Sequence, residues 1–136
     1  MALIADFWRT QAWQVAIKPT EAAGHATLLA REASLAGHEM VIAAGGDGTL
    51  GEVTNGLAGS PTIMAPLPTG TANSFAKELR MPRPTLFNKH RLLDAVDALA
   101  AGRVQGMDLG YTPDAIEDNG RYWLLWASVG ADSYLV

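Results

Sequence analysis

The chain has 136 residues, of which 49% are hydrophobic and 18% charged, which fits one globular domain and excludes a disordered protein. It has no cysteine, which excludes a disulfide scaffold, a thiolate metal site and a cysteine nucleophile. A formal charge of −4 argues against a nucleic-acid partner. Residues 1–10 do not read as a signal peptide, and the apolar run at 123–131 is shorter than the about 20 residues that span a bilayer. We therefore expect a cytoplasmic protein, with at most peripheral contact at the inner face of the membrane.

The first part of the chain alternates between helical and extended patterns. Residues 3–11 predict a short helix, and residues 13–18 alternate apolar and polar side chains as a strand does. Residues 21–36 carry apolar side chains at helical spacing and end at Gly37. Residues 40–44 form a short apolar run, which is typical of a parallel strand buried on both faces.

The alternation continues through the middle of the chain. Residues 49–57 and 71–79 place apolar side chains on one face of a helix, and residues 62–67 between them predict a strand. Residues 80–89 contain two prolines and predict a loop.

The last part of the chain predicts one helix and two strands. Asn88 can cap a helix over residues 89–101, with four side chains facing the core: Leu92, Leu93, Val96 and Leu99. Residues 104–109 and 122–129 predict strands joined by a turn. Strands and helices in this order predict an α/β fold, a parallel sheet covered on both faces, with ligands at the carboxyl ends of the strands.

A glycine-rich loop falls at one of these carboxyl ends. Gly45-Gly46-Asp47-Gly48-Thr49 separates a predicted strand from a predicted helix. Glycines let a ligand approach the backbone, and the amides at a helix start attract phosphate. A carboxylate in such a loop repels phosphate unless a divalent cation or a donor hydroxyl lies between, so Asp47 indicates Mg²⁺ or a substrate hydroxyl. The alternative is a tight turn in which Asp47 caps the helix.

A second loop of the same kind follows the next predicted strand. It reads Pro68-Thr69-Gly70-Thr71-Ala72-Asn73, and Thr71 can cap the following helix or offer its hydroxyl to a ligand. Because successive strands end at one sheet edge, we expect the two loops to converge. Thr20 follows an earlier predicted strand and belongs to the same edge, or instead caps a helix that begins near Glu21.

Together these residues resemble the catalytic domain of diacylglycerol kinases and their bacterial lipid-kinase relatives, which include sphingosine kinases. The similar stretches are I-A-A-G-G-D-G-T-L-G-E-V-T-N-G-L (42–57), P-T-G-T-A-N-S-F-A-K-E-L (68–79), M-D-L-G (107–110) and S-V-G-A-D (128–132). The first stretch alone is shared with NAD kinases and phosphofructokinases, whereas its combination with the second points to lipid kinases.

The resemblance implies a three-layer, parallel-sheet nucleotide-binding domain of the NAD kinase/diacylglycerol kinase type. Residues 1–122 would form the catalytic domain, and residues 123–136 the start of a truncated second lobe. The family's first strand and most of its β-rich C-terminal lobe, with the catalytic base and metal-binding residues, would be absent. We therefore expect weak nucleotide binding and little phosphate transfer by this chain alone.

The resemblance also implies the ligands, which are ATP, Mg²⁺ and a lipid acceptor. The implied ATP contacts are Thr20, Gly45, Gly46, Asp47, Gly48, Thr49, Leu50, Gly51, Gly70 and Thr71. Asp47 would lie near the metal and phosphates or on the acceptor side, and Asn73 near the acceptor. Gly51 departs from a common family asparagine and predicts a weakened or later helix, since glycine disfavours helix by about 1 kcal/mol. Glu52 and Asn55 share a helix face, and for Glu52 we favour structural bracing.

Basic residues around the predicted proline-containing loop suggest contact with an anionic membrane surface, although a solvated loop explains them too. They are Lys77, Arg80, Arg83, Lys89 and Arg91. Two other functions remain open, an NAD kinase-like phosphotransferase and a non-catalytic nucleotide-binding scaffold. A homo-oligomer or a partner chain that covers the truncated edge also remains open.

Overall fold

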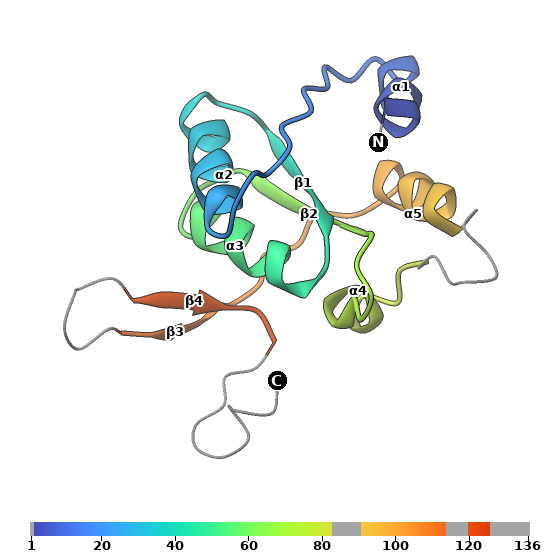
Figure 1. Ribbon diagram of the computed structural model, residues 1–136. Helices are drawn as coiled ribbons and strands as arrows, with labels where there is room; N and C mark the ends of the chain where they lie inside the picture. The colour runs from blue at the N-terminus through green and yellow to red at the C-terminus, as the bar shows by residue number, and fades with distance from the viewer. Residues whose placement is uncertain (1, 83–90, 114–119, 126–136) are drawn as a thin grey trace.

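The parallel pair β1 and β2 lies at the centre of the molecule, as Figure 1 shows for the computed structural model. The structure describes residues 2–82, 91–113 and 120–125. The helices are α1 (Ala2–Thr10), α2 (His25–Leu35), α3 (Asp47–Leu57), α4 (Ser74–Glu78) and α5 (Arg91–Ala100). The strands are β1 (Met40–Gly45), β2 (Ile63–Pro68), β3 (Gly110–Thr112) and β4 (Arg121–Trp123). No helix in these three described stretches is long and apolar enough to cross a membrane.

The central strands run parallel and end together. Met40 pairs with Ile63 at one end, and Gly45 pairs with Pro68 at the other. The helix α3 makes the crossover between the strands, as parallel pairing requires. The two strands predicted at 40–44 and 62–67 are therefore confirmed, and both glycine loops start from the same edge.

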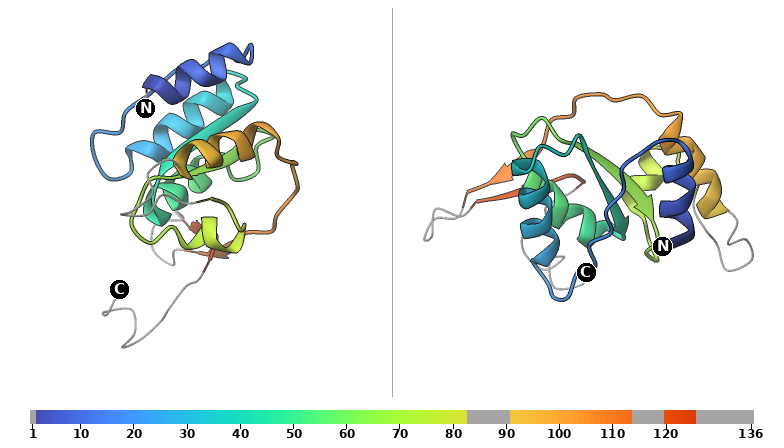
Figure 2. Two further views of the ribbon diagram at one scale, coloured as in Figure 1. Left: turned by 90° about the vertical axis from the view of Figure 1, so that its right-hand side faces the viewer. Right: turned by 90° about the horizontal axis from the view of Figure 1, so that it is seen from above.

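Helices cover both faces of this sheet, as the view from above in Figure 2 shows. On one face, Ala43 packs with a cluster drawn from α2, α3 and α4: Ala26, Ala30, Leu50, Val53, Leu57 and Phe75. On the other face, Leu67 packs with side chains of α1 and α5: Ile4, Trp8, Ala95 and Val96. Burial on both faces explains the continuous apolar runs of the two strands and confirms the three-layer α/β fold.

α2 and α3 approach closely because of one glycine and one carboxylate. A Cβ at Gly56 would collide with the Thr27 carbonyl oxygen and the Ala30 side chain, so glycine permits the contact. The Glu52 carboxylate accepts a hydrogen bond from the Ala26 amide (3.1 Å), and the Thr27 hydroxyl donates to the Glu52 carbonyl (2.9 Å). Glu52 thus caps α2 from the neighbouring helix, which is the bracing role favoured for it.

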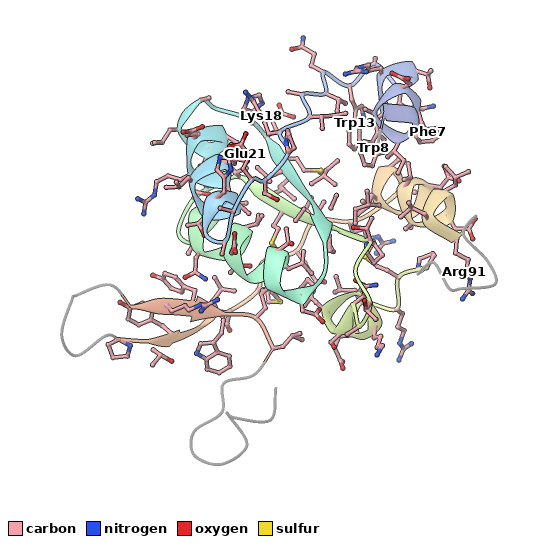
Figure 3. All side chains as sticks on the ribbon, in the orientation of Figure 1. Phe7, Trp8, Trp13, Lys18, Glu21 and Arg91 are labelled. Carbon is pink, nitrogen blue, oxygen red and sulfur yellow. The ribbon has the colours of Figure 1, made fainter. Side chains whose placement is uncertain are left out.

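α1 ends in a turn that folds the chain back. Ala12 adopts a left-handed conformation (φ 65°), and the Trp13 amide donates to the Trp8 carbonyl (3.2 Å). This C-terminal motif places Trp13 on Trp8, with ring centroids 6.0 Å apart. Figure 3 shows Phe7, Trp8 and Trp13 gathered at α1.

The strand predicted at residues 13–18 is wrong. These residues have no regular secondary structure and belong to no strand of the described structure. A strand needs a neighbour whose backbone completes its hydrogen bonds, and the apolar alternation here serves packing instead. Trp13 and Val15 pack against the α1–α5 cluster, and the Val15 carbonyl accepts a hydrogen bond from the Arg9 guanidinium (3.0 Å).

The start of α2 also differs from the prediction. The helix begins at His25 and not at residue 21, because Gly24 is left-handed (φ 81°) and interrupts the helical path. The Glu21 amide donates to the His25 imidazole Nδ1 (3.1 Å) before the helix begins. Thr20 therefore does not cap this helix. The end is as predicted, since Gly37 is left-handed (φ 79°) just beyond the helix.

The C-terminal third departs furthest from the predictions. The helix is confirmed as α5, but Leu93 is 49% exposed because it faces away from the sheet. The strand predicted at 104–109 is wrong, since Val104 is 67% exposed and strand pairing starts only at Gly110. The second predicted strand is β4, which begins at Arg121. Several predicted features lie outside the described residues. They are the Asn88 cap, residues 83–89 of the loop, most of the turn before Gly120 and residues 126–129 of the last strand.

Candidate functional site

The two glycine loops touch each other at the carboxyl edge of the sheet. The Thr69 amide donates to the Gly45 carbonyl (3.2 Å), which extends the β1–β2 pairing by one step. A Cβ at Gly70 would lie 2.5 Å from the Gly46 Cα and 2.8 Å from its nitrogen. Any side chain at Gly70 would therefore push the loops apart. The predicted convergence of the loops is confirmed.

The first loop is tight at one glycine and open at another. A Cβ at Gly45 would collide with the Thr49 side chain, whereas a Cβ at Gly48 would meet no atom within 4 Å. Gly46 is the N-cap of α3 and supplies no side-chain cap. The first amides of a helix have no partner within the helix, so the start of α3 can receive an anion beside Gly48.

Asp47 joins the two loops. One carboxylate oxygen accepts a hydrogen bond from the Ser74 amide (2.9 Å), and the other accepts from the Phe75 amide (3.0 Å). Asp47 belongs to α3 but caps α4, which lies 27 residues further along the chain. The predicted alternative of a capping carboxylate is correct in kind, but the capped helix is a different one.

These contacts set the protonation of Asp47. Burial alone raises the pKa of its carboxyl group. The hydrogen bonds from the amides of Ser74 and Phe75 and from the Ser74 side chain, with the positive charge of Lys77, outweigh burial and lower the pKa. The carboxylate is therefore held ionised at neutral pH.

Asn73 closes the second loop on itself. It is left-handed (φ 49°) and only 3% exposed. Its carboxamide oxygen accepts from the Gly70 amide (3.1 Å), and its nitrogen donates to the Gly70 carbonyl (2.6 Å). The helix consequently starts at Ser74 and not at residue 71, and Thr71 does not cap it. Asparagine suits this place because its short amide tolerates the left-handed region.

The structure brings most of the predicted site residues to one edge. They are Gly45, Gly46, Asp47, Gly48, Thr49, Gly70 and Asn73. Thr71 is exposed immediately after Gly70. Gly51 lies one turn into α3, which starts earlier than predicted because Asp47 and Gly48 are already helical.

One predicted contact is not supported by its position. Leu50 has a 2% exposed side chain in the core, and its amide donates to the Gly46 carbonyl (3.1 Å), so it has no free group for a ligand. Thr20 is exposed in the segment before α2. Its neighbours Lys18 and Glu21 lie on the α2 side of the molecule in Figure 3.

Sequence reasoning missed the partners of Asp47 and Asn55. Asp47 bonds to backbone amides, and backbone groups leave no signature in the side-chain pattern. Asn55 bonds to the backbone of Tyr122, 67 residues away. Only the position of Asn55 on the same helix face as Glu52 marked it as a residue with a role.

The described residues do not by themselves fit a protein-held Mg²⁺ site. Both oxygens of Asp47 already accept amide hydrogen bonds. Within the part of the chain that the structure describes, no three histidine, aspartate or glutamate side chains gather around a common point. Mg²⁺ commonly binds through substrate phosphates and one or two carboxylates, so any ion here would depend on the nucleotide.

A separate hollow of about 370 Å³ lies at the opposite, amino ends of the strands. Its lining is Ser34, Gly37, His38, Glu39, Pro61, Thr62 and Ile63. Ligands of parallel α/β sheets bind at the carboxyl ends. We therefore place the candidate site at the glycine loops and not in this hollow.

A family model described as the diacylglycerol kinase catalytic domain matches residues 2–112. The chain belongs to this family. It is 35% identical over 133 residues to a diacylglycerol kinase of Bacillus subtilis (strain 168), with 96% of this chain and 40% of that protein covered. Diacylglycerol kinases of Staphylococcus carnosus (strain TM300) and Staphylococcus aureus (strain JH9) are 36% and 35% identical over 113 residues. These matches cover 82% of this chain and about a third of each protein (33% and 32%).

Membership in the diacylglycerol kinase family gives the two glycine loops their context. The match spans both loops and all of the central sheet. The chain spans at most 40% of the length of these curated relatives.

Proposed function

We propose that the chain is the nucleotide-binding part of an ATP-dependent lipid kinase, which transfers the γ-phosphate of ATP to the hydroxyl of a diacylglycerol-like or sphingoid acceptor. The observation that carries the proposal is the direct contact of two glycine loops at the carboxyl edge of a parallel sheet. Family membership supplies the reaction class, because the relatives are named diacylglycerol kinases. The second loop favours this reading over an NAD kinase-like enzyme.

We assign the phosphates of ATP to the open side of the first loop. The start of α3 offers amides that have no partner within the helix, and Gly48 leaves room for a ligand. The contact between Gly46 and Gly70 brings the second loop beside the same position. Thr49, Gly51 and Thr71 border this position along the chain, and the exposed Thr20 stays among the proposed ATP contacts.

Asp47 has a positioning role in this proposal. Its carboxylate holds the start of α4 beside the first loop, so the spacing between the loops depends on it. It is a poor general base for a lipid hydroxyl, because its pKa is lowered and its oxygens already accept hydrogen bonds. The general base of the proposed reaction must therefore be a group other than Asp47.

Asn73 shapes the acceptor side without touching a ligand through its side chain. Both polar groups of its carboxamide bond to Gly70, and the side chain is almost wholly buried. Its contribution is to fix the conformation of the second loop.

The basic residues around α4 and α5 would bring the enzyme to an anionic membrane. Lys77 and Arg80 are exposed at the end of α4, and Arg91 is exposed at the start of α5, at the edge of the molecule in Figure 3. Arg83 and Lys89 lie outside the described residues. Each basic residue near a headgroup contributes about 1 kcal/mol. Arg80→Gln with Arg91→Gln should weaken binding to anionic vesicles, whereas Arg31→Gln on the far helix α2 should not.

Calorimetry with ATP and Mg²⁺ tests the nucleotide site. Gly48→Val fills the space proposed for phosphate, while Gly106→Val fills equally open space outside both loops. We expect ATP to bind the unchanged chain and the Gly106→Val control, and Gly48→Val to weaken binding at least tenfold (about 1.4 kcal/mol). Equal binding by both variants, or no binding by the folded chain at millimolar ATP, would contradict the nucleotide site.

Acceptor assays test the reaction class. Labelled ATP is offered with diacylglycerol, sphingosine or NAD, and the labelled product is identified. We expect label in lipid alone, at a low rate for this chain. Label in NAD would favour the NAD kinase-like alternative, and ATP binding without any transfer would favour the scaffold alternative.

A further inference from the structure

The β3–β4 hairpin is attached to α3 through the side chain of Asn55. Its carboxamide nitrogen donates to the Tyr122 carbonyl (2.9 Å), and its oxygen accepts from the Tyr122 amide (2.9 Å). The same nitrogen also donates to the Gly51 carbonyl, one turn earlier in α3 (2.8 Å). Asn55 thus uses both donor hydrogens and pairs with Tyr122 as a neighbouring strand would.

The described residues that follow β4 add apolar packing to this contact. Leu124 and Leu125, just after β4, pack against the core cluster that contains Leu50 and Val53 of α3. Tyr122 itself is directed outward and packs against Tyr111 of β3, with ring centroids 4.8 Å apart. In Figure 1 the hairpin extends away from the remaining elements beyond this attachment. Asn55 therefore carries the directional part of the hairpin's contact with α3.

The same face of α3 carries the contact to the second glycine loop. Asp47, Gly51 and Asn55 follow one another at intervals of four residues, which places them in a line along one face of the helix. At the first position the carboxylate of Asp47 holds α4. At the last position the side chain of Asn55 holds β4. The carbonyl of Gly51, which lies between Asp47 and Asn55, accepts the other hydrogen bond that the Asn55 carboxamide nitrogen donates. One rigid helix thus links both ends of the line.

We infer that Asn55 is a positioning residue that couples the placement of the β3–β4 hairpin to the glycine loops. The coupling to ATP rests on the proposed function. Ligand bound at the start of α3 orders the helix, and the hairpin is attached to that helix by directional hydrogen bonds. On this inference ATP stabilises the docked hairpin, and linkage then requires the docked hairpin to strengthen ATP binding by the same factor.

Hydrogen exchange of the Tyr122 amide, followed by NMR, tests the attachment. Asn55→Leu removes all three hydrogen bonds, and Asn55→Asp keeps the acceptor but sets a carboxylate against two carbonyl oxygens. Thr27→Val is the matched control, because it removes one side-chain bond to α3 on the α2 side, far along the chain from the hairpin. We expect the protection of the Tyr122 amide from exchange to fall about tenfold in both Asn55 variants, because about one net hydrogen bond is lost. In Thr27→Val this protection should stay unchanged. Unchanged protection in the Asn55 variants would overturn the inference.

The response to Mg-ATP separates coupling from a merely structural role. In the unchanged chain and in Thr27→Val, ATP should raise the protection of Tyr122. In Asn55→Leu that rise should disappear. The ATP dissociation constant of this variant should increase by the same factor by which ATP raises the protection of Tyr122 in the unchanged chain. Normal ATP binding by Asn55→Leu would overturn the coupling and leave the proposed function standing. Failure of the unchanged chain to bind ATP would refute the proposed function and the coupling, while the attachment by Asn55 is decided by exchange without ligand.

Discussion

The two glycine loops leave neighbouring strands at the same edge but begin their helices differently. After the first loop, α3 starts at once at Asp47 and runs for 11 residues, with the side-chain-less Gly46 as N-cap. After the second loop, the left-handed Asn73 delays α4, which has only 5 residues. The amides at the start of α4 are satisfied by Asp47 of the first loop. The start of α4 therefore depends on a side chain of α3, in addition to the hydrogen bonds between Asn73 and Gly70 that close the second loop.

The largest effect should come from closing the space between the loops. Gly70→Ala places a methyl group against the Gly46 backbone, which cannot give way as a flexible side chain does. We expect a loss of about 3 kcal/mol in the free energy of unfolding, measured with urea. The reciprocal Gly46→Ala is the matched control, since its Cβ would lie an ordinary 3.5 Å from the Gly70 Cα. Equal losses in the two variants would show that the loops do not touch as described.

Removing the carboxylate that joins the loops should rank second. Asp47→Asn leaves one oxygen to accept a hydrogen bond but turns an amide nitrogen toward the other backbone N–H. We expect the free energy of unfolding to fall by about 2 kcal/mol at neutral pH, because hydrogen bonds to a charged carboxylate are lost. Asp97→Asn, at an exposed position of α5, is the control and should change the stability little.

The same variant gives a pH dependence. Because the folded state lowers the pKa of Asp47, its contribution is fully present above the unfolded value of about 3.9 and is lost as pH falls through the folded value. The stability difference between the unchanged chain and Asp47→Asn should therefore shrink below about pH 4. If the difference in unfolding free energy stays constant down to about pH 3, Asp47 does not cap α4 as an ionised carboxylate.

A smaller effect should separate the two things that Asn73 supplies. Asn73→Gly loses the hydrogen bonds to Gly70 but accepts the positive φ, while Asn73→Ala loses both. We expect the alanine variant to be less stable than the glycine variant by about 1 kcal/mol in urea unfolding. If the two variants are equally stable, the second loop is not held in the left-handed conformation.

The smallest effect should be at the other carboxylate of α3. Glu52→Gln can still accept the Ala26 amide but loses the charge that favours the start of α2. We expect Glu52→Gln to lower the free energy of unfolding by about 0.5 kcal/mol. Glu52→Ala should lower it further, because alanine has no side-chain acceptor for the Ala26 amide. Glu78→Gln on α4 is the exposed control. A loss as large as that of Asp47→Asn would remove the distinction between the two carboxylates.

Sequence patterns predicted the central part of the fold well and its edges poorly. The runs at 40–44 and 62–67 belong to a sheet that helices cover on both faces, so their continuous hydrophobicity marks them as strands. Residues 13–18, which alternate apolar and polar side chains, and residues 104–109 were also predicted as strands but find no strand partner in the described structure. Alternation reports that one side of a segment can be buried, not which element will bury it.

The candidate site shows the same division at the level of single residues. The glycine-threonine pattern identified Gly46 and Gly70 as loop residues, and these two glycines let the loops approach each other closely. It also predicted Thr71 as a helix cap, and here the Asn73 turn prevailed, since two bonds to Gly70 close the loop first. Leu50 was predicted from its place in the motif, yet its side chain belongs to the core.

The sequence by itself determined the α/β class, the two glycine loops and their meeting at one edge, because the apolar runs of the strands and the glycine turns that follow them depend on local residue types. Only the tertiary structure decided which groups those loops bind within the protein. Asp47 caps α4 and not its own helix, Glu52 caps α2, and Asn55 holds β4. Each of these side chains bonds to a backbone group far along the chain, and every residue type except proline offers the same backbone donor and acceptor. Such partners are therefore selected by the packing of the elements and not by the identity of the residue that is contacted.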